Sequence, residues 1–168
     1  MNNRVAVLKG FVWGVNWGKP EHRRIVNNVT RNLKNYSAVA WDGDLLKNDS
    51  FTRVLFHIMQ TYPNKKYITF KKEKHVGKLN AGHVENNKGK RAAGYPRITK
   101  SPINVRKTPS NIGWRNLGIW GIKNLKNSYK NVDIYFLGQG QVALNEEETL
   151  KTMKIPGVNI KKHYNVSR

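Results

Sequence analysis

One segment of the chain concentrates positive side chains that could neutralise the phosphates of a nucleic acid. Residues 71–110 contain 11 Lys or Arg and two Glu, a net charge of +9. Counterion release would drive such binding, which would therefore depend strongly on salt and little on sequence. The alternative is a solvated loop whose charge only keeps the protein in solution. The predicted contacts, which include two aromatic residues able to stack on bases, are Lys71, Lys72, Lys74, Lys78, Lys88, Lys90, Arg91, Tyr95, Arg97, Lys100, Arg106, Lys107 and Trp114.

A loop rich in Gly and Trp could hold a smaller phosphate ligand. Glycines let backbone N–H groups approach a phosphate, and the start of the following helix adds positive potential. The spacing matches neither the dinucleotide-binding fingerprint nor the Walker loop, so a packed structural loop is the alternative. This candidate ligand site comprises Gly10, Trp13, Gly14, Asn16, Trp17, Gly18 and Lys19, together with Gly138 and Gly140 from a later turn.

Two carboxylates at the end of a short apolar run are the candidate catalytic residues. Asp42-Gly43-Asp44-Leu45-Leu46 resembles the first motif of the haloacid-dehalogenase-like phosphatases. The resemblance implies that Asp42 is a nucleophile and Asp44 a general acid. That family carries the motif on its first strand and an acidic pair for magnesium later in the chain, a pair this sequence lacks. The alternative is a turn in which the Asp side chains accept hydrogen bonds from nearby backbone N–H groups.

The turn Gly138-Gln139-Gly140 lies between a strand pattern and a helix pattern. It is similar to the nucleotide-handling loop of the lysine-decarboxylase-like (SLOG) family, whose Gly-rich turn precedes a Glu. In this chain three carboxylates, Glu146 to Glu148, follow the turn and would repel a phosphate. A tight turn between strand and helix is the alternative.

Other chemistries lack the residues that they need. The chain has no Cys, which excludes disulfides, thiolate zinc sites, Cys nucleophiles and iron–sulfur clusters. Its five His are dispersed without a metal-site spacing, and it has no Gly-x-Ser-x-Gly motif. We therefore predict no metal and no cofactor, and the missing catalytic set favours a protein that is not an enzyme.

Alternating apolar patterns indicate the elements that position these residues. Gly and Pro residues interrupt any long regular element between 71 and 110. Elsewhere the patterns predict strands over 4–12, 37–41, 66–70, 132–137 and 158–166. They predict helices over 20–34, 51–61, 114–125 and 146–153, with Asp49 or Ser50 as the N-cap of the second and Asn145 as the N-cap of the last.

This alternation predicts an α/β fold. We expect a three-layer Rossmann-like or flavodoxin-like domain with a mostly parallel sheet, in which ligands bind beyond the carboxyl ends of the strands. One domain would span residues 1–168, with a long basic insertion at about 71–112. The last strand is strongly basic, so we expect it at an edge of the sheet.

The composition agrees with a folded, cationic protein. Hydrophobic residues make up 38% of 168, while 31 Lys and Arg against 10 Asp and Glu give a net charge of +21. Such an excess is typical of proteins with polyanionic partners. Codon bias could supply many of the Lys residues but does not explain the scarcity of acidic ones. The apolar runs are too short to cross a bilayer and no secretory signal is visible, so we expect an intracellular protein without a transmembrane segment.

Two functions remain open. The first is a non-enzymatic protein that binds RNA, DNA or another polyanion through its phosphates, as a component of a ribonucleoprotein or virus particle would. The alternative is a small enzyme or sensor that binds a nucleotide or phosphorylated metabolite at the loops beyond the strands.

Overall fold

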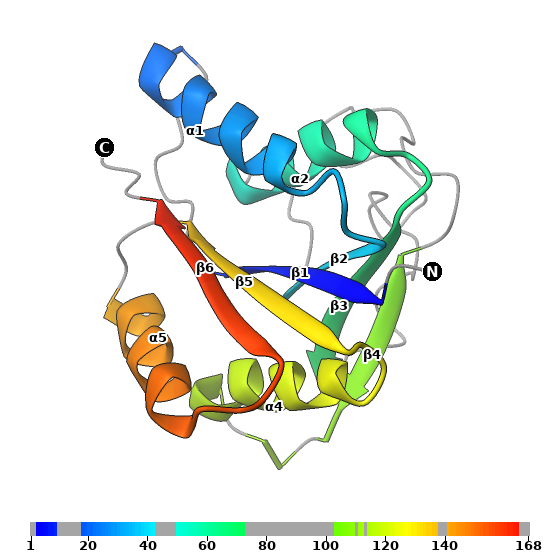
Figure 1. Cartoon of the computed structure of the whole chain (residues 1–168), viewed down its shortest axis with the longest axis vertical. Helices are drawn as coiled ribbons and strands as arrows, with labels where there is room; N and C mark the ends of the chain where they lie inside the picture. The colour runs from blue at the N-terminus through cyan, green and yellow to red at the C-terminus, as the bar shows by residue number, and fades with distance from the viewer. Residues whose placement is uncertain are drawn as a thin grey trace.

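The fold is built on a six-stranded sheet. The structure is a computed structural model that describes residues 3–9, 18–42, 50–72, 103–109, 111–112, 114–137 and 141–164. Every neighbouring pair of strands is parallel, and the order is β4-β3-β2-β1-β5-β6 (Figure 1). The strands are β1 (Arg4–Lys9), β2 (Ala38–Asp42), β3 (Lys66–Lys72), β4 (Asn104–Thr108), β5 (Asn131–Leu137) and β6 (Val158–Tyr164).

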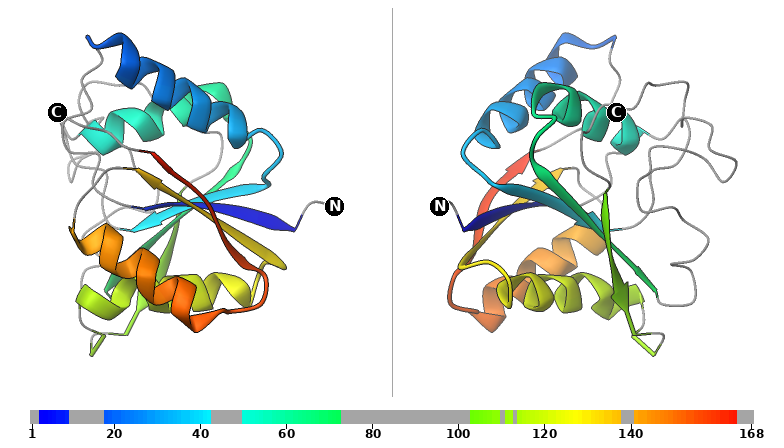
Figure 2. Two further views of the ribbon diagram at one scale, coloured as in Figure 1. Left: turned by 60° about the vertical axis from the view of Figure 1, so that its left-hand side comes forward. Right: turned by 90° about the vertical axis from the view of Figure 1, so that its right-hand side faces the viewer.

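Helices cover both faces of the sheet. On one face lie α1 (Pro20–Asn32) and α2 (Ser50–Thr61), and on the other lie α4 (Trp114–Lys126) and α5 (Gln141–Met153) (Figure 2). Pro20 is in the first turn of α1, where its missing N–H costs no helical hydrogen bond. The predicted α/β fold with a parallel sheet is therefore confirmed, and β6 is an edge strand as expected.

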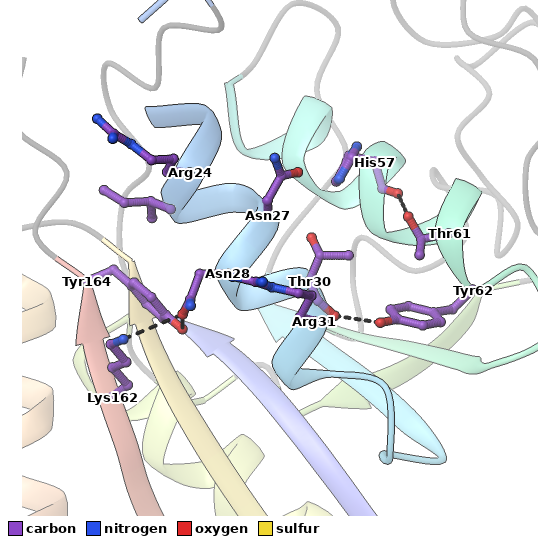
Figure 3. A pocket seen from close by; sticks show the side chains of 11 residues that line it. Arg24, Asn27, Asn28, Thr30, Arg31, His57, Thr61, Tyr62, Lys162 and Tyr164 are labelled. Atoms are coloured by element: carbon purple, nitrogen blue, oxygen red, sulfur yellow. Dashed lines mark hydrogen bonds between the residues drawn. The ribbon is translucent and has the colours of Figure 1, made fainter. Parts of the chain in front are cut away.

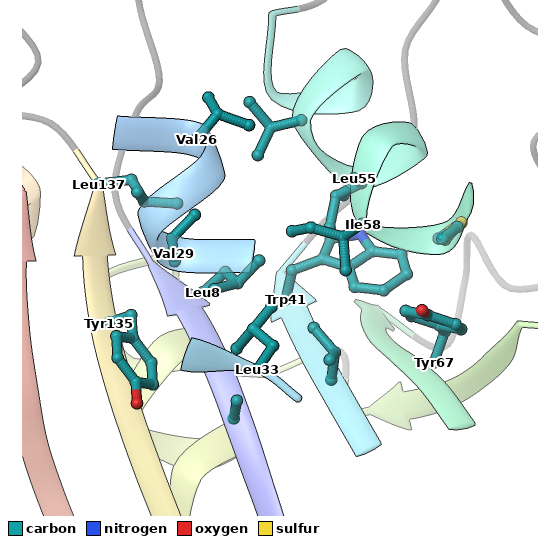
Figure 4. Packing of buried hydrophobic residues seen from close by; sticks show 14 of the residues in the cluster. Leu8, Val26, Val29, Leu33, Trp41, Leu55, Ile58, Tyr67, Tyr135 and Leu137 are labelled. Carbon is teal, nitrogen blue, oxygen red and sulfur yellow. The ribbon is translucent and has the colours of Figure 1, made fainter. Parts of the chain in front are cut away.

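Strand side chains alternate between two apolar cores. Along β1, Ala6 and Leu8 belong to the core under α1 and α2, whereas Val5 and Val7 belong to the core under α4 and α5. Figure 4 shows the first of these cores, with fully buried Trp41 among side chains from both helices. Because both faces are covered, the central strands read as continuous apolar runs, which is why the sequence revealed them.

Strand β4 was not expected from the sequence. This strand pairs in parallel with β3, which itself continues to Lys72, so both ends of the segment expected to be irregular carry sheet structure. The reason is that β4 lies at an edge of the sheet, and its sequence Asn-Val-Arg-Lys-Thr has no apolar pattern to signal it. Residues 73–102 lie outside the described part of the chain.

The predicted N-cap of the last helix is wrong. We expected Asn145 before the helix, but α5 begins at Gln141 and Asn145 lies inside it, where its carbonyl accepts a hydrogen bond from Thr149 Oγ1 at 2.9 Å. The three Glu residues therefore follow the first turn instead of forming it. Two of them make tertiary contacts, Glu146 an ion pair with Lys9 and Glu147 a hydrogen bond with His163, so they join α5 to β1 and β6.

A bulge in β6 sets which face each of its later side chains meets. Ile134 of β5 pairs with Ile160, but the next residue, Tyr135, pairs with Lys162, so Lys161 is an extra residue on β6. Because side chains alternate along a strand, one extra residue exchanges the faces of all those that follow. Ile160 accordingly packs with the α4–α5 core, whereas Tyr164 belongs to the core under α1 and α2.

A buried polar network joins β1, β5 and β6 near their amino ends. Asp133 is 2% exposed. Its Oδ2 accepts hydrogen bonds from Tyr36 at 2.7 Å and Arg4 at 3.0 Å, and its Oδ1 accepts one from Asn159 at 3.0 Å. Burial acts to raise the pKa of Asp133, but these hydrogen bonds outweigh it and hold the pKa below its ordinary value. The network therefore requires the ionised carboxylate.

Candidate nucleic-acid interface

An open groove of about 780 Å³ lies on the α1 side of the sheet, beside the end of β6 (Figure 3). We call it the basic groove. Its lining residues come from α1, from α2 and the residue after it, and from β6; they are Arg24, Ile25, Asn27, Asn28, Thr30, Arg31, His57, Thr61, Tyr62, Lys162 and Tyr164.

Helix α1 contributes a polar stripe to the groove. Arg24, Asn27, Asn28 and Arg31 are spaced by three, four and seven residues, so they lie on one face of the helix. Both Arg side chains are exposed, whereas Val26 and Val29 on the opposite face are buried in the core. The apolar face of α1 thus fixes the helix on the sheet and leaves the two guanidinium groups at the surface.

The β6 wall of the groove is built by the bulge and by a hydrogen-bond network. Tyr164 OH donates to Asn28 Oδ1 at 2.7 Å and accepts from Asn32 Nδ2 at 2.8 Å. The ammonium of Lys162 lies 3.4 Å from Asn28 Oδ1 and 4.7 Å from the centre of the Tyr164 ring. These contacts tie the end of β6 to α1 and hold Lys162 at the edge of the groove.

The α2 wall supplies neutral polar groups. Tyr62 OH donates to the carbonyl of Thr30 at 2.7 Å, which links the end of α2 to α1. His57 is half-buried, and this burial lowers the pKa of its imidazole and thereby favours the uncharged ring. Asn27 and His57 face each other across the space between the two helices (Figure 3).

The charge of the groove is entirely of one sign. Its lining contains Arg24, Arg31 and Lys162, and none of its described lining residues is Asp or Glu. The opposite face of the sheet differs, because α5 carries Glu146, Glu147 and Glu148. An anion entering the groove therefore meets three cations and several amide or hydroxyl groups, while Glu21 in the first turn of α1 lies outside this lining.

A second charged cluster lies at the carboxyl edge of the sheet. The side chain of Lys9, at the end of β1, is 3% exposed, and its Nζ is 2.7 Å from Oε1 of Glu146 on α5. A Cβ atom at Gly118 of α4 would overlap both charged groups, so this close approach requires glycine. The pair lies where the strand order reverses, with β2 on one side of β1 and β5 on the other.

Few of the predicted nucleic-acid contacts fall within the described residues. Lys71 and Lys107 are cross-strand partners in β3 and β4, and Lys72 and Trp114 are placed by their backbones at the end of β3 and the start of α4. Arg106 donates to Asn124 at 2.8 Å and Ser128 at 3.2 Å, so it ties β4 to the end of α4. The predicted contacts outside the described part are Lys74, Lys78, Lys88, Lys90, Arg91, Tyr95, Arg97 and Lys100.

The predicted small-ligand residues flank one edge of the sheet. Gly18 and Lys19 immediately precede α1, and Asp42 ends β2. The ends of β1, β2 and β5 meet at this edge, because Leu8 pairs with Trp41 and Lys9 with Phe136. The other predicted residues lie outside the described ranges: Gly10, Trp13, Gly14, Asn16, Trp17, Asp44, Gly138 and Gly140.

The basic groove was not among the sites expected from the sequence. The spacing of Arg24, Asn28 and Arg31 on the polar face of α1 was an available signal, but a charged helix face is usually only solvated. No sequence signal places Lys162 beside this stripe, because its position depends on the bulge at Lys161. The groove is therefore a product of tertiary structure.

Among the described residues, no group of three His, Asp or Glu is placed to hold a metal ion. No helix in the described ranges has the length and apolar character to cross a membrane. Comparison of the chain with protein-family models, curated proteins and solved structures finds no match.

Proposed function

We propose that this protein binds the phosphate backbone of a nucleic acid and catalyses no reaction. The observation that supports this function is the basic groove, in which α1 and β6 contribute three cations to a hollow whose described lining has no carboxylate. Arg and Lys side chains supply most of the affinity in such interfaces by displacing condensed counterions. The net charge of +21 agrees with a polyanionic partner, such as the RNA or DNA of a larger assembly.

The basic segment predicted at about 71–112 would extend this interface. Its described residues include the end of β3 and all of β4, which is the edge strand opposite to β6. Contacts from two places on the molecule would raise affinity by making the second contact intramolecular. In this proposal the groove and the segment both contact phosphates, and neither selects a base sequence.

The fold that we infer for this binding protein is Rossmann-like. Doubly wound sheets of that type have the order 3-2-1-4-5-6, with the reversal beside the first strand. Here β2 and β3 lie on one side of β1, β5 and β6 lie on the other, and β4 is added beside β3. A flavodoxin-like sheet has a single strand on the first side of β1, so the present order favours the Rossmann-like alternative.

Removing the three groove cations tests the proposed function. The Arg24→Gln/Arg31→Gln/Lys162→Gln variant should bind DNA and RNA oligonucleotides about a hundredfold more weakly at about 0.1 M salt, because three phosphate contacts are lost. For the same reason, the slope of log affinity against log salt should become shallower by about two. Fluorescence anisotropy at several salt concentrations measures both quantities.

The matched control removes three exposed cations elsewhere. Lys123, Lys130 and Lys154 lie on or after α4 and α5, so their replacement by Gln lowers the net charge equally without touching the groove. This control should bind nearly as well as the native protein. Equal weakening in both variants, or unchanged salt dependence in the groove variant, would overturn the proposed function.

A second candidate function is supported by the strand order alone. Open α/β sheets bind small ligands at the point where the strand order reverses, which here lies between β1 and β5. Lys9 and Glu146 lie beside that point. A nucleotide or phosphorylated metabolite bound there would raise the melting temperature of the native protein and of the groove variant equally.

A further inference from the structure

We propose that the basic groove takes a single-stranded nucleic acid in preference to a duplex. This inference rests on the proposed function, because it names which form of nucleic acid the same groove accepts. Three features carry it: the placement of the cations on two sides of the hollow, the hydrogen-bonding groups between them, and the fixed shape of the walls.

The cations are placed to hold a backbone along a short, curved path. Arg24 and Arg31 are seven residues apart on α1, which is about 10 Å along the helix axis. Lys162 stands beside this stripe on β6, so the positive groups line the α1 and β6 sides of the groove, opposite the α2 side that carries His57 and Thr61. A flexible strand can bend its phosphates toward all three, whereas the phosphates of a stiff duplex lie on a convex surface.

The groups between the cations fit an unpaired base. Asn27 of α1 presents an amide, and across from it α2 presents the half-buried imidazole of His57 and the hydroxyl of Thr61, whose proton is donated to the carbonyl of His57 at 2.9 Å. Amides, hydroxyls and neutral imidazoles can donate and accept hydrogen bonds, as the edges of exposed bases do. In a duplex the Watson–Crick edges of the bases are paired with each other, so only a single strand offers those edges to a hollow of this kind.

The walls of the groove are fixed before binding. Tyr164 is hydrogen-bonded to Asn28 and Asn32, and Tyr62 is hydrogen-bonded to the carbonyl of Thr30. A groove already held open loses little conformational freedom when a strand enters it. The preference therefore comes from the shape and lining of the groove, whereas its three charges attract either form.

The test compares a short mixed-sequence DNA single strand with the duplex that it forms with its complement. Fluorescence anisotropy at about 0.15 M salt should give about tenfold tighter binding of the single strand by the native protein. The Asn27→Ala/His57→Ala variant should lose that preference, binding the single strand about tenfold more weakly and the duplex as before. Because His57 is half-buried, Asn27→Ala alone, at an exposed position, serves as the second variant and should lose part of the preference.

The outcomes separate this inference from the proposed function. Equal native affinity for both forms, or equal weakening of both forms by the Asn27 and His57 substitutions, overturns the single-strand preference. In either case, loss of binding in the Arg24, Arg31 and Lys162 variant still upholds phosphate binding in the groove. If that charge variant binds both forms as the native protein does, the proposed function fails as well.

Discussion

Replacing Lys9 by Met is expected to lower the free energy of unfolding by about 3 kcal/mol. The Lys9 side chain is 3% exposed and the Glu146 side chain 18%, with 2.7 Å between ammonium and carboxylate. Met retains most of the apolar stem but removes the charge, so the Glu146 carboxylate would stay largely buried without its cation. An unpaired buried charge costs far more than the net contribution of the pair.

Urea denaturation of matched variants checks this expectation. Lys151 also pairs with a Glu of α5, at 3.0 Å from Glu147, but its side chain is 63% exposed. Lys151→Met should therefore cost less than about 1 kcal/mol. The double variant Lys9→Met/Glu146→Leu should recover most of the lost stability, since it removes both charges. A Lys9→Met protein no less stable than Lys151→Met would show that the pair at the carboxyl edge is not structural.

Asp133→Ala is expected to cost about 3 kcal/mol, because it removes a carboxylate that accepts three hydrogen bonds. Tyr36 and Asn159 would each lose a charged acceptor, and Arg4 would lose its ion pair with Asp133 at 3.0 Å. The substitution also leaves a cavity between three strands. Chemical denaturation measures the loss, and Glu148→Ala on the exposed surface of α5, which removes a carboxylate without this network, should be nearly neutral.

Acid should remove the stabilisation that the ionised Asp133 carboxylate gives to the native protein. The folded-state pKa of Asp133 is lowered, so its ionised form stabilises the fold above the unfolded-state pKa of about 3.9, and this stability is lost as the pH falls through the folded-state value. Glu147 has a lowered pKa of the same origin, through hydrogen bonds from His163 and Lys151 that outweigh its burial. Asp133→Asn should therefore show a weaker fall in melting temperature between about pH 5 and pH 2 than the native protein. An identical acid profile in both proteins would contradict this assignment.

The central strands and helices could be predicted from the sequence because their buried positions are occupied by apolar residues in a regular pattern. Val5, Val7, Ile134 and Phe136 are buried on strands covered on both faces, and their apolar runs marked β1 and β5. Strand β4 left no such signal, since it pairs only with β3 at the edge of the sheet. Strand β4 forms by pairing with β3, which lies more than 30 residues earlier, and the local spacing of apolar residues carries no information about such a distant partner.

The candidate site could be predicted only in its general chemistry. Net charge indicated a polyanionic partner, but it directed attention to the basic segment after β3 instead of to α1. The groove combines a helix stripe, a second helix and the end of an edge strand, and each part alone is an ordinary surface. Only the folded arrangement brings Arg31, Lys162 and His57 around the same hollow.

The extra residue in β6 also determines which deletion the groove would tolerate. If Lys161 were deleted, the ladder would run evenly from Ile160 to Lys162, and Lys162 and Tyr164 would keep facing α1 while His163 kept facing Glu147. If Lys161 were kept and paired with Tyr135 without a bulge, Lys162 would face the α4–α5 side of the sheet and His163 would face the α1 side. Deletion of Lys161 should therefore preserve the groove, because the pairing register places Lys162 beside α1.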